Sequence, residues 1–243
     1  MIDKRKCEYK DFYWVFIKNA LELTEGQTFH NEIGFVFYPN QYIFESLDVS
    51  DRYIVMIIPD DKHMHRTTGC AHSYSTTSVT IDKIMDLSRV ETFEELWTDG
   101  VSMMDVCKEI ISYLSYNSYY RPLSWFIDKC RAIHKDKFDT ETFVKMMLCS
   151  AIEYNNLDLV DFIVYNLEKD LSKFSLDNDI LISLSKLVAN QAEKPDFCYR
   201  IIKKLLDYGF MTNLDSSSVI YQMFITMCYT LNHENTAELL KST

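Results

Sequence analysis

The chain has 243 residues, of which 47% are hydrophobic and 14% aromatic, and its formal net charge is −11. This length and composition allow a sizeable core, in one large or two small domains. The acidic balance argues against a nucleic-acid or membrane-surface binder, because both need basic groups opposite phosphates. Glycine and proline number five and four. Tight turns in sandwiches and barrels use more of both, so the composition favours helices.

Localisation signals point to a cytoplasmic protein. The first residues, MIDKRKCEYKDFYW, lack the apolar stretch of a secretory signal. The longest aliphatic run, YIVMII at 53–58, is too short to span a bilayer. The seven cysteines are odd in number, scattered, and without a CxxC pair, which indicates reduced thiols rather than a disulfide framework.

Residues 1–100 are predicted to form an α+β module. The spacing of apolar residues predicts a helix over 11–25. A helix is also expected at 90–100, with Thr92 as candidate N-cap and Gly100 as its stop. Extended apolar runs between turn residues predict strands at 33–40, 51–61 and 78–87, with a short helix at 41–47. The run at 53–58 is apolar at consecutive positions, as in a strand buried on both faces.

Residues 101–243 are predicted to be helical throughout. Apolar residues recur there every three or four positions, between short polar breaks. The predicted helices cover 102–117, 121–134, 140–155, 157–169, 178–191, 196–209, 217–232 and 235–242. Short breaks between long helices indicate about four antiparallel pairs.

Similar segments recur within this helical part. Taking Phe126-Ile127, Phe162-Ile163, Lys204-Leu205 and Leu239 as equivalent, the intervals are about 36, 42 and 35 residues, close to the ~33 of an ankyrin repeat. The segment MLCSAIEYNNLDLVDFIVYN (147–166) resembles the ankyrin core. RIIKKLLDYG, ending at Gly209, and NHENTAELLK (232–241) resemble later helices and turns of the same family. The family's Thr-Pro-Leu-His tetrapeptide is absent. The resemblance implies a degenerate helical solenoid.

Two positions carry the resemblance inside the first helix of the repeat. Leu148 and Ala151 match its apolar and small positions, and Cys228 falls where Ala151 falls. The sequence NNLDLV stands where the family turns into its second helix.

A second resemblance concerns the N-terminal module. GFVFYPNQYIFESLDVSDRYIVMIIPDD and TIDKIMDLSRVETFEELWTDG are similar to the module that precedes ankyrin arrays in proteins of mimivirus-like giant DNA viruses. This resemblance implies a viral protein that binds another protein in the host cytoplasm. The negative charge predicts a neutral or basic protein partner, whose association rate falls as salt rises.

Four candidate zinc ligands lie within ten residues, at the spacing H-x-H-x4-C-x-H: His63, His65, Cys70 and His72. Imidazole and thiolate are the ligands that zinc prefers. In an extended segment, alternate side chains share a face, and a turn at Gly69 would bring the two pairs together. The alternative is a polar loop without metal. An open site would support a metal-dependent enzyme, with Asp60, Asp61 or His30 as general base.

The segment NSYYRPLSW contains candidate partner-binding residues: Tyr119, Tyr120, Arg121 and Trp125. Tyrosine, tryptophan and arginine are enriched at binding hot spots. The alternative is that Trp125 and one tyrosine belong to the core. The helical stripes contain five cysteines expected in the core, namely Cys107, Cys130, Cys149, Cys198 and Cys228, and His134 and His233 are expected to cap helices or face solvent.

The sequence therefore predicts a non-enzymatic protein–protein interaction module with no resident cofactor. Two alternatives stay open: a metal-dependent enzyme centred on 60–72, and an oligomeric structural or virion protein. The sequence leaves the oligomeric state open.

Overall fold

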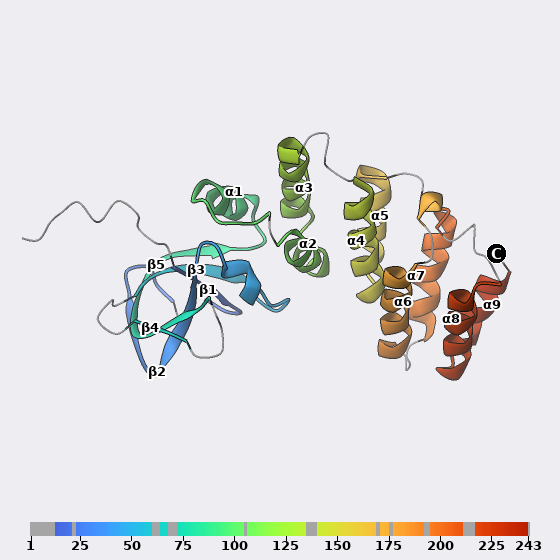
Figure 1. Ribbon diagram of the computed structural model, residues 1–243, viewed down its shortest axis with the longest axis horizontal. Helices are drawn as coiled ribbons and strands as arrows, with labels where there is room; N and C mark the ends of the chain where they lie inside the picture. Colours follow the sequence, from blue (N-terminus) through green and yellow to red (C-terminus); the bar gives the residue numbers. More distant parts are fainter. Residues whose placement is uncertain are drawn as a thin grey trace, which may run out of the picture. The chain divides into compact units, whose positions relative to one another are not determined.

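The computed structural model contains five strands and nine α-helices within its described residues (Figure 1). Those residues are 13–20, 23–59, 64–67, 72–104, 106–134, 140–168, 171–174, 177–191, 195–210 and 217–242. The chain divides into two compact units. The first comprises Met1–Tyr113 and Arg121–Cys130, and the second comprises Leu114–Tyr120 and Arg131–Thr243.

The first unit contains an antiparallel sheet. Its strands are β1 (Tyr13–Ile17), β2 (Thr28–Pro39), β3 (Tyr53–Pro59), β4 (His65–Arg66) and β5 (Tyr74–Asp86). Their order is β2-β1-β3-β5-β4, and β2 also pairs with β5. The pairings therefore run in a closed circuit from β2 through β1, β3 and β5 back to β2. The β2–β5 register shifts between His30 and Phe35, where Gly34 has a φ of 94°.

The centre of the sheet is apolar on both faces. All residues of Ile54–Ile57 in β3 are buried, as expected from the consecutive apolar run at 53–58, but Ile58 at its end is 51% exposed. Successive side chains of a strand alternate between faces, so both faces must be covered. One buried cluster comprises Phe37, Val55, Ile57, Val79 and Ile81. A 3-10 helix (Ile43–Ser46) contributes Ile43 and Phe44 to the core.

Polar contacts tie the sheet to the helices of the same unit. Trp14 is fully buried in β1, and its Nε1 donates to Oδ1 of Asn40 at 2.6 Å. Nδ2 of Asn40 donates to the carbonyl of Asp99 at 3.0 Å, at the end of α1 (Val90–Thr98). Tyr113 Oη donates to the carbonyl of Asp51 at 2.7 Å. Each bond satisfies a polar group that the core would otherwise leave without a partner.

Two predictions in this unit are wrong. The helix expected over 11–25 is replaced by β1, whose residues pair with both β2 and β3. Aromatic and β-branched side chains fill YWVFI and favour a pleated strand when neighbours are available on both sides. Thr92 is not the N-cap of α1, because Arg89 occupies that position, and the Thr92 hydroxyl donates to the carbonyl of Asp86.

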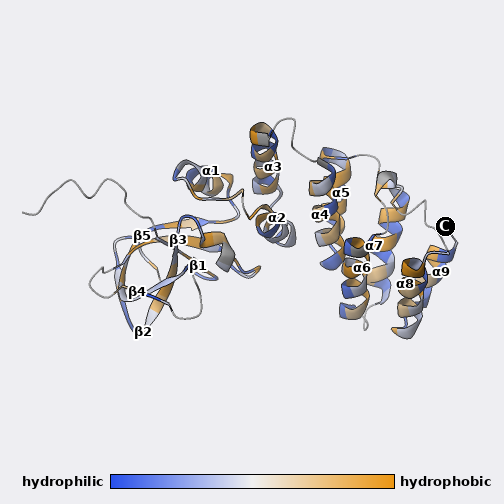
Figure 2. Cartoon of the chain, viewed as in Figure 1, coloured by the Kyte–Doolittle hydropathy of each residue, from blue (hydrophilic) through white to orange (hydrophobic). Residues whose placement is uncertain are grey.

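Helices follow from residue 107 onward, close to the predicted bounds. They are α2 (Cys107–Tyr116), α3 (Tyr120–His134), α4 (Thr140–Glu153), α5 (Leu157–Asn166), α6 (Asn178–Asn190), α7 (Pro195–Asp207), α8 (Val219–Thr230) and α9 (Glu234–Lys241), with a 3-10 turn at Leu171–Lys173. Figure 2 shows both hydrophobic and hydrophilic residues on every helix from α4 to α9.

The helices of the second unit pack in a regular order. α4 contacts α5, α6 contacts α7, and α8 contacts α9. In addition, α6 packs between α4 and α8, while α7 packs between α5 and α9 (Figure 1). Each helix buries one stripe, which is the reason that its apolar residues recur every three or four positions.

Candidate functional site

A two-residue turn reverses the chain between α4 and α5. Asn155 has a φ of 51°, its N–H donates to the carbonyl of Ile152 at 3.1 Å, and the next N–H, of Asn156, donates to Ala151 at 2.8 Å. This pair of bonds satisfies carbonyls that the end of a helix leaves free. Asparagine tolerates the left-handed conformation better than most residues.

The same turn occurs twice more in the second unit. Ser118 has a φ of 57°, and Asn232 has a φ of 62°. At the latter, the Asn232 N–H donates to Tyr229 at 3.2 Å and the His233 N–H to Cys228 at 2.7 Å. Three equivalent turns therefore connect helices that the chain places in succession.

The residues after the αL positions Asn155 and Asn232 are the N-caps of the following helices and also contact an earlier helix. Asn156 is the N-cap of α5, and its Oδ1 accepts the N–H of Leu159 at 3.0 Å. Its Nδ2 donates to the carbonyl of Ser115 at 2.9 Å, and Tyr120 Oη donates to its Oδ1 at 3.2 Å. The side-chain amide of Asn156 thus caps the N-terminus of α5 and links it to the turn after α2.

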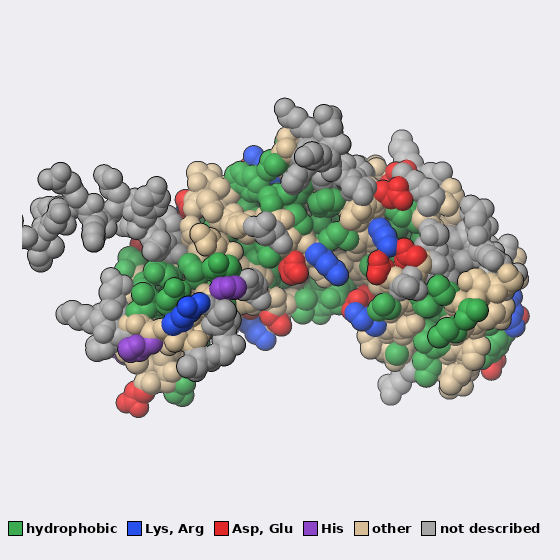
Figure 3. Space-filling view, in the orientation of Figure 1, with side chains coloured by type: hydrophobic (Ala, Val, Ile, Leu, Met, Phe, Trp, Pro, Cys, Tyr) green, Lys and Arg blue, Asp and Glu red, His purple; other side chains and the backbone are tan. Residues whose placement is uncertain are grey.

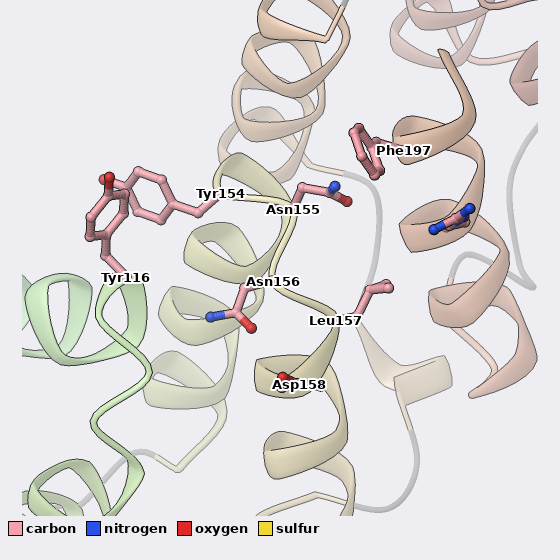
Figure 4. Close-up of a pocket in the computed structure, with 8 residues that line it drawn as sticks. Tyr116, Tyr154, Asn155, Asn156, Leu157, Asp158 and Phe197 are labelled. Atoms are coloured by element: carbon pink, nitrogen blue, oxygen red, sulfur yellow. The ribbon is translucent and has the colours of Figure 1, made fainter. Parts of the chain in front are cut away.

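A hollow of about 450 Å³ opens beside this turn (Figure 4). Tyr116 and Tyr154 form one wall, with their rings edge-to-face at 4.6 Å between centroids and 79° between planes. In Figure 4, Asn155 lies between this wall and Phe197 of α7, and Leu157 lies below Phe197. The lining is completed by Asn156, Asp158 and Arg200.

Two opposite charges flank the hollow. Asp158 lies in the first turn of α5, where the helix dipole favours a carboxylate. The Arg200 guanidinium lies 5.7 Å from the ring centroid of Phe197, as in a cation–π contact. Both side chains are exposed, and neither forms an ion pair with another described residue. The charges are therefore available to a ligand.

This set of side chains is suited to recognition. The lining residues include no serine, cysteine or histidine that would act as a nucleophile or general base. Aromatic faces, amides and separate opposite charges are groups that can bind peptide groups and charged side chains.

The predicted partner-binding residues do not gather at one place. Tyr120 is half-buried, with its ring stacked on Phe162 at 5.3 Å and 15°. Trp125 belongs to the first unit, where its ring meets Trp97 edge-to-face at 6.3 Å. Arg121 is exposed and Tyr119 is half-buried. None of the four lines the hollow.

The predicted zinc ligands are described in part. His65 is exposed on β4, while His72 is half-buried with its ring stacked on Tyr42 at 3.8 Å. The N–H of Thr67 donates to the carbonyl of Ser73 at 3.0 Å, and the turn expected at Gly69 lies outside the described residues. His63, Cys70, Asp60 and Asp61 lie outside the described residues. Among the residues that are described, no three His, Cys, Asp or Glu side chains form a metal-binding group. The zinc site stays a prediction.

The five described cysteines differ in burial. Cys130, Cys198 and Cys228 are buried, as predicted, whereas Cys107 and Cys149 are half-buried. Burial raises the pKa of Cys198 and of Cys228 to about 12, so both are thiols at neutral pH.

His233 differs from the expectation of a solvated or capping side chain. It occupies the N-cap position of α9 but is fully buried and makes no side-chain cap bond. Its Nε2 lies 3.1 Å from the carbonyl of Val188, to which it donates because a carbonyl only accepts. The side chain of His134 lies outside the described set.

Sequence reasoning missed the hollow. Its walls come from α2, the α4–α5 turn and α7, which the sequence separates by about 80 residues. The sequence NNLD was the available signal. Two asparagines between helices, in αL and N-cap positions, indicate a tight turn, and the side chains next to such a turn are exposed.

No family model, curated protein or solved structure matches the chain. Within the described part, no helix combines the length and the hydropathy needed to cross a membrane.

Proposed function

We propose that residues 101–243 form a degenerate ankyrin-like array and that the chain is a non-enzymatic module that binds another protein. The observation that supports the array is the equivalence of its helix pairs. Such pairs cannot bury an apolar stripe singly, so neighbours stack and leave an extended surface for a partner.

Buried positions of the first helices correspond at fixed intervals. A shift of 36 residues relates α4 to α6, as from Val144 to Ile180, and a shift of 77 relates α4 to α8, as from Val144 to Tyr221. The equivalent buried sets are Val144, Met147, Leu148 and Ala151; Ile180, Ser183, Leu184 and Leu187; and Tyr221, Phe224, Ile225 and Cys228.

The second helices follow the same rule. A shift of 77 also relates α5 to α9, as from Val160 to Ala237, whereas α5 and α7 are related by 38, as from Ile163 to Ile201. The pair α6–α7 therefore has a turn two residues longer than those of its neighbours, in agreement with the lengthened NQAEKPDF segment.

Ion pairs connect the α4–α5 pair to the α6–α7 pair. Lys186 Nζ of α6 lies 2.8 Å from Glu153 of α4, and Lys204 Nζ of α7 lies 2.6 Å from Asp161 of α5. Tyr208 Oη also donates to Asp161 at 2.9 Å. Half-exposed pairs of this kind add little stability, but they fix the register of one helix pair on the next.

The hollow beside the α4–α5 turn is the proposed partner site. A basic side chain of a partner would meet the faces of Tyr116 and Tyr154 and the carboxylate of Asp158, which together favour a cation. Residues Arg200 and Asn155 would meet acidic or peptide groups next to it. A neutral or basic protein segment fits this arrangement and the net charge of −11. The viral origin and host-cytoplasmic site implied by the resemblances are part of the same proposal.

The test compares proteins captured by matched full-length variants. Tyr154→Ala removes an aromatic wall of the hollow. Tyr165→Ala removes an equally large ring that is 71% exposed on α5 and outside the hollow. We expect wild type and Tyr165→Ala to retain the same specific protein from host lysate and Tyr154→Ala to lose it.

Salt dependence and charge reversal make the test sharper. The association rate measured with the captured protein should fall as salt rises, and Asp158→Lys should slow it further. Equal binding by wild type, Tyr154→Ala and Asp158→Lys would contradict the proposed site. Recovery of no specific protein by any variant would contradict the proposed function.

A further inference from the structure

Two cysteines of the first unit lie against each other on neighbouring helices. Cys107 is the first residue of α2, and Cys130 lies in the C-terminal half of α3. A hydrogen bond joins the two thiols. Both also contact Met104, because Cys107 Sγ donates to its carbonyl at 2.8 Å and Cys130 Sγ lies 3.8 Å from its Sδ. The fold therefore brings two thiols that are distant in sequence into direct contact.

The two thiols differ in their access to solvent. Cys107 is half-buried, whereas Cys130 is fully buried. Figure 3 shows hydrophobic side chains, the class that includes cysteine and methionine, at the surface over α3. A reagent dissolved in water can therefore reach Cys107 but not Cys130.

The acidity of the two thiols differs in the same sense. The N-terminus of a helix favours the thiolate, which is the nucleophilic form, and Cys107 occupies this position in α2. The hydrogen bond with Cys107, and then burial, raise the pKa of the Cys130 thiol far above its ordinary value. We therefore expect Cys107 to react first and Cys130 second.

Each of the other described cysteines lacks one of these features. Cys198 and Cys228 are close enough to interact electrostatically, but both are fully buried. Cys149 is half-buried, and its thiol is hydrogen-bonded to Ser183. Among the described residues, only the pair on α2 and α3 combines contact between two thiols with access to solvent.

We propose that Cys107 and Cys130 form a redox-active dithiol that low-molecular-weight disulfides of the glutathione class oxidise to an intrachain disulfide. The Cys107 thiolate attacks one sulfur of such a molecule, whose S–S bond breaks and releases a first thiolate. Cys130 then attacks the Cys107 sulfur of the mixed disulfide and displaces the second thiolate. The two protons that the cysteines lose go to the released thiolates. Two protein thiols are thus oxidised as one small disulfide is reduced to two thiols.

The new bond stabilises the first unit. It closes the segment between residues 107 and 130 into a loop, which restricts the unfolded chain more than the folded one. The hydroxyl of Tyr113 already links α2 to the sheet through the carbonyl of Asp51. Oxidation should therefore raise the melting temperature of the first unit by several degrees, and reduction should reverse the change.

The test equilibrates the full-length chain in mixtures of reduced and oxidised glutathione. Free thiols are then blocked with a maleimide under denaturing conditions, and disulfides are mapped by mass spectrometry. Wild type should lose two thiols together, and the bridged peptides should contain Cys107 and Cys130. The fluorescence of Trp97 and Trp125, which lie in the same unit, should report the higher melting temperature of the bridged form.

Two variants separate the roles of the two sulfur atoms. Cys130→Ala should accumulate glutathione as a mixed disulfide on Cys107, because the second thiol that would displace it is gone. Cys107→Ala should leave Cys130 unmodified, because that thiol is buried. Circular dichroism of the reduced proteins should show the helix content of wild type for both variants. Equal modification of the two variants would contradict the proposed order of attack.

Cys228→Ala is the matched control. It removes one thiol of the other close pair and introduces the residue that stands at Ala151, the equivalent position of α4. This variant should form the bridge between Cys107 and Cys130 as wild type does. Free thiols at both positions in fully oxidised glutathione would overturn the proposal, as would a stable mixed disulfide on wild type or a bridge between other cysteines.

The inference goes beyond the proposed function and does not depend on it. Disulfide mapping and melting are measured on the isolated chain, whereas the proposed function is tested by capture of a partner. The failure of one proposal is therefore distinguishable from the failure of the other.

Discussion

The sheet is stabilised by contacts between residues that are distant in sequence, whereas the helix pairs depend on local turns and on contacts with the next pair. In the first unit, a chain of hydrogen bonds links Trp14 to Asn40 and Asn40 to Asp99, across three elements distant in sequence. In the second unit, the same local turn recurs, and the helices from α4 to α7 each contact the helix that lies two further along the chain. Truncation of one buried side chain should therefore destabilise the whole sheet. In the second unit, truncation of one turn residue should weaken only the contact between two neighbouring helix pairs.

Trp14→Ala should have the largest effect and should act on the sheet. Truncation of a fully buried aromatic residue costs about 3–5 kcal/mol, and it also leaves Asn40 without its donor. Trp97 and Trp125, the remaining tryptophans, both lie in the first unit. Their fluorescence during urea unfolding should report a lower midpoint for that unit.

The control is measured on the same samples. Far-ultraviolet circular dichroism is dominated by the helices, most of which lie in the second unit. The helical transition of Trp14→Ala should stay close to that of wild type. Equal shifts of both signals would show that the two units unfold as one, which would remove the contrast drawn above.

Asn156→Ala should have an intermediate effect on the helix pairs. The change removes the N-cap of α5 and the bond to Ser115, for a combined loss of about 1–3 kcal/mol. The matched control is Asn166→Ala, at an exposed position near the end of the same helix, and it should be close to neutral. Urea unfolding followed by circular dichroism measures both. A neutral Asn156→Ala would mean that the turns do not fasten one pair to the next.

Asn155→Gly should stabilise the same turn slightly. Glycine adopts the φ of 51° without steric cost, and the change removes an Oδ1 that is buried without a hydrogen-bond partner. We expect a gain of about 0.5–1 kcal/mol, while Asn155→Ala should be destabilising. Thermal melting of the two variants against wild type tests the difference, and a gain from alanine would contradict the role of the backbone conformation.

Asp51→Asn should have the smallest effect and should appear as a change in pH dependence. Burial raises the pKa of Asp51 above its ordinary value of 3.8, although the N–H of Asp48 partly opposes this. Because the folded state favours the protonated carboxyl, Asp51 contributes its full stabilisation below pH 3.8. This contribution is lost as pH rises through the folded-state pKa.

Asparagine keeps an acceptor for the Asp48 N–H without the buried charge. Tryptophan fluorescence should therefore show a first unit that is slightly more stable at neutral pH and less sensitive to pH between 3.8 and neutral. An unchanged pH profile would show that Asp51 does not contribute to the linkage.

The helices were predictable because each buries a stripe that its own sequence displays. Ala151 of α4 and Cys228 of α8, for example, both lie in such stripes and are both fully buried. The strand at Trp14 was not predictable in the same way, since its conformation depends on β2 and β3 lying on either side. Local spacing carries no information about those neighbours.

The candidate site was less predictable than the fold. Tyr120 and Trp125 attracted attention as aromatic residues in one short stretch, but Tyr120 stacks on Phe162 and Trp125 packs against Trp97. Composition does not distinguish a ring that faces a partner from one that faces its own core. The wall formed by Tyr116 and Tyr154 depends on two helices meeting, which no short segment encodes.

The tight turns also constrain how the length of this chain can change over evolution. At α4–α5, two successive N–H groups close onto the end of α4, so one inserted residue would detach both. The α6–α7 turn is longer, and its second helix opens with Pro195, a residue without an N–H to satisfy. Homologous chains should therefore gain and lose residues at 190–195 and keep a constant length at 154–157.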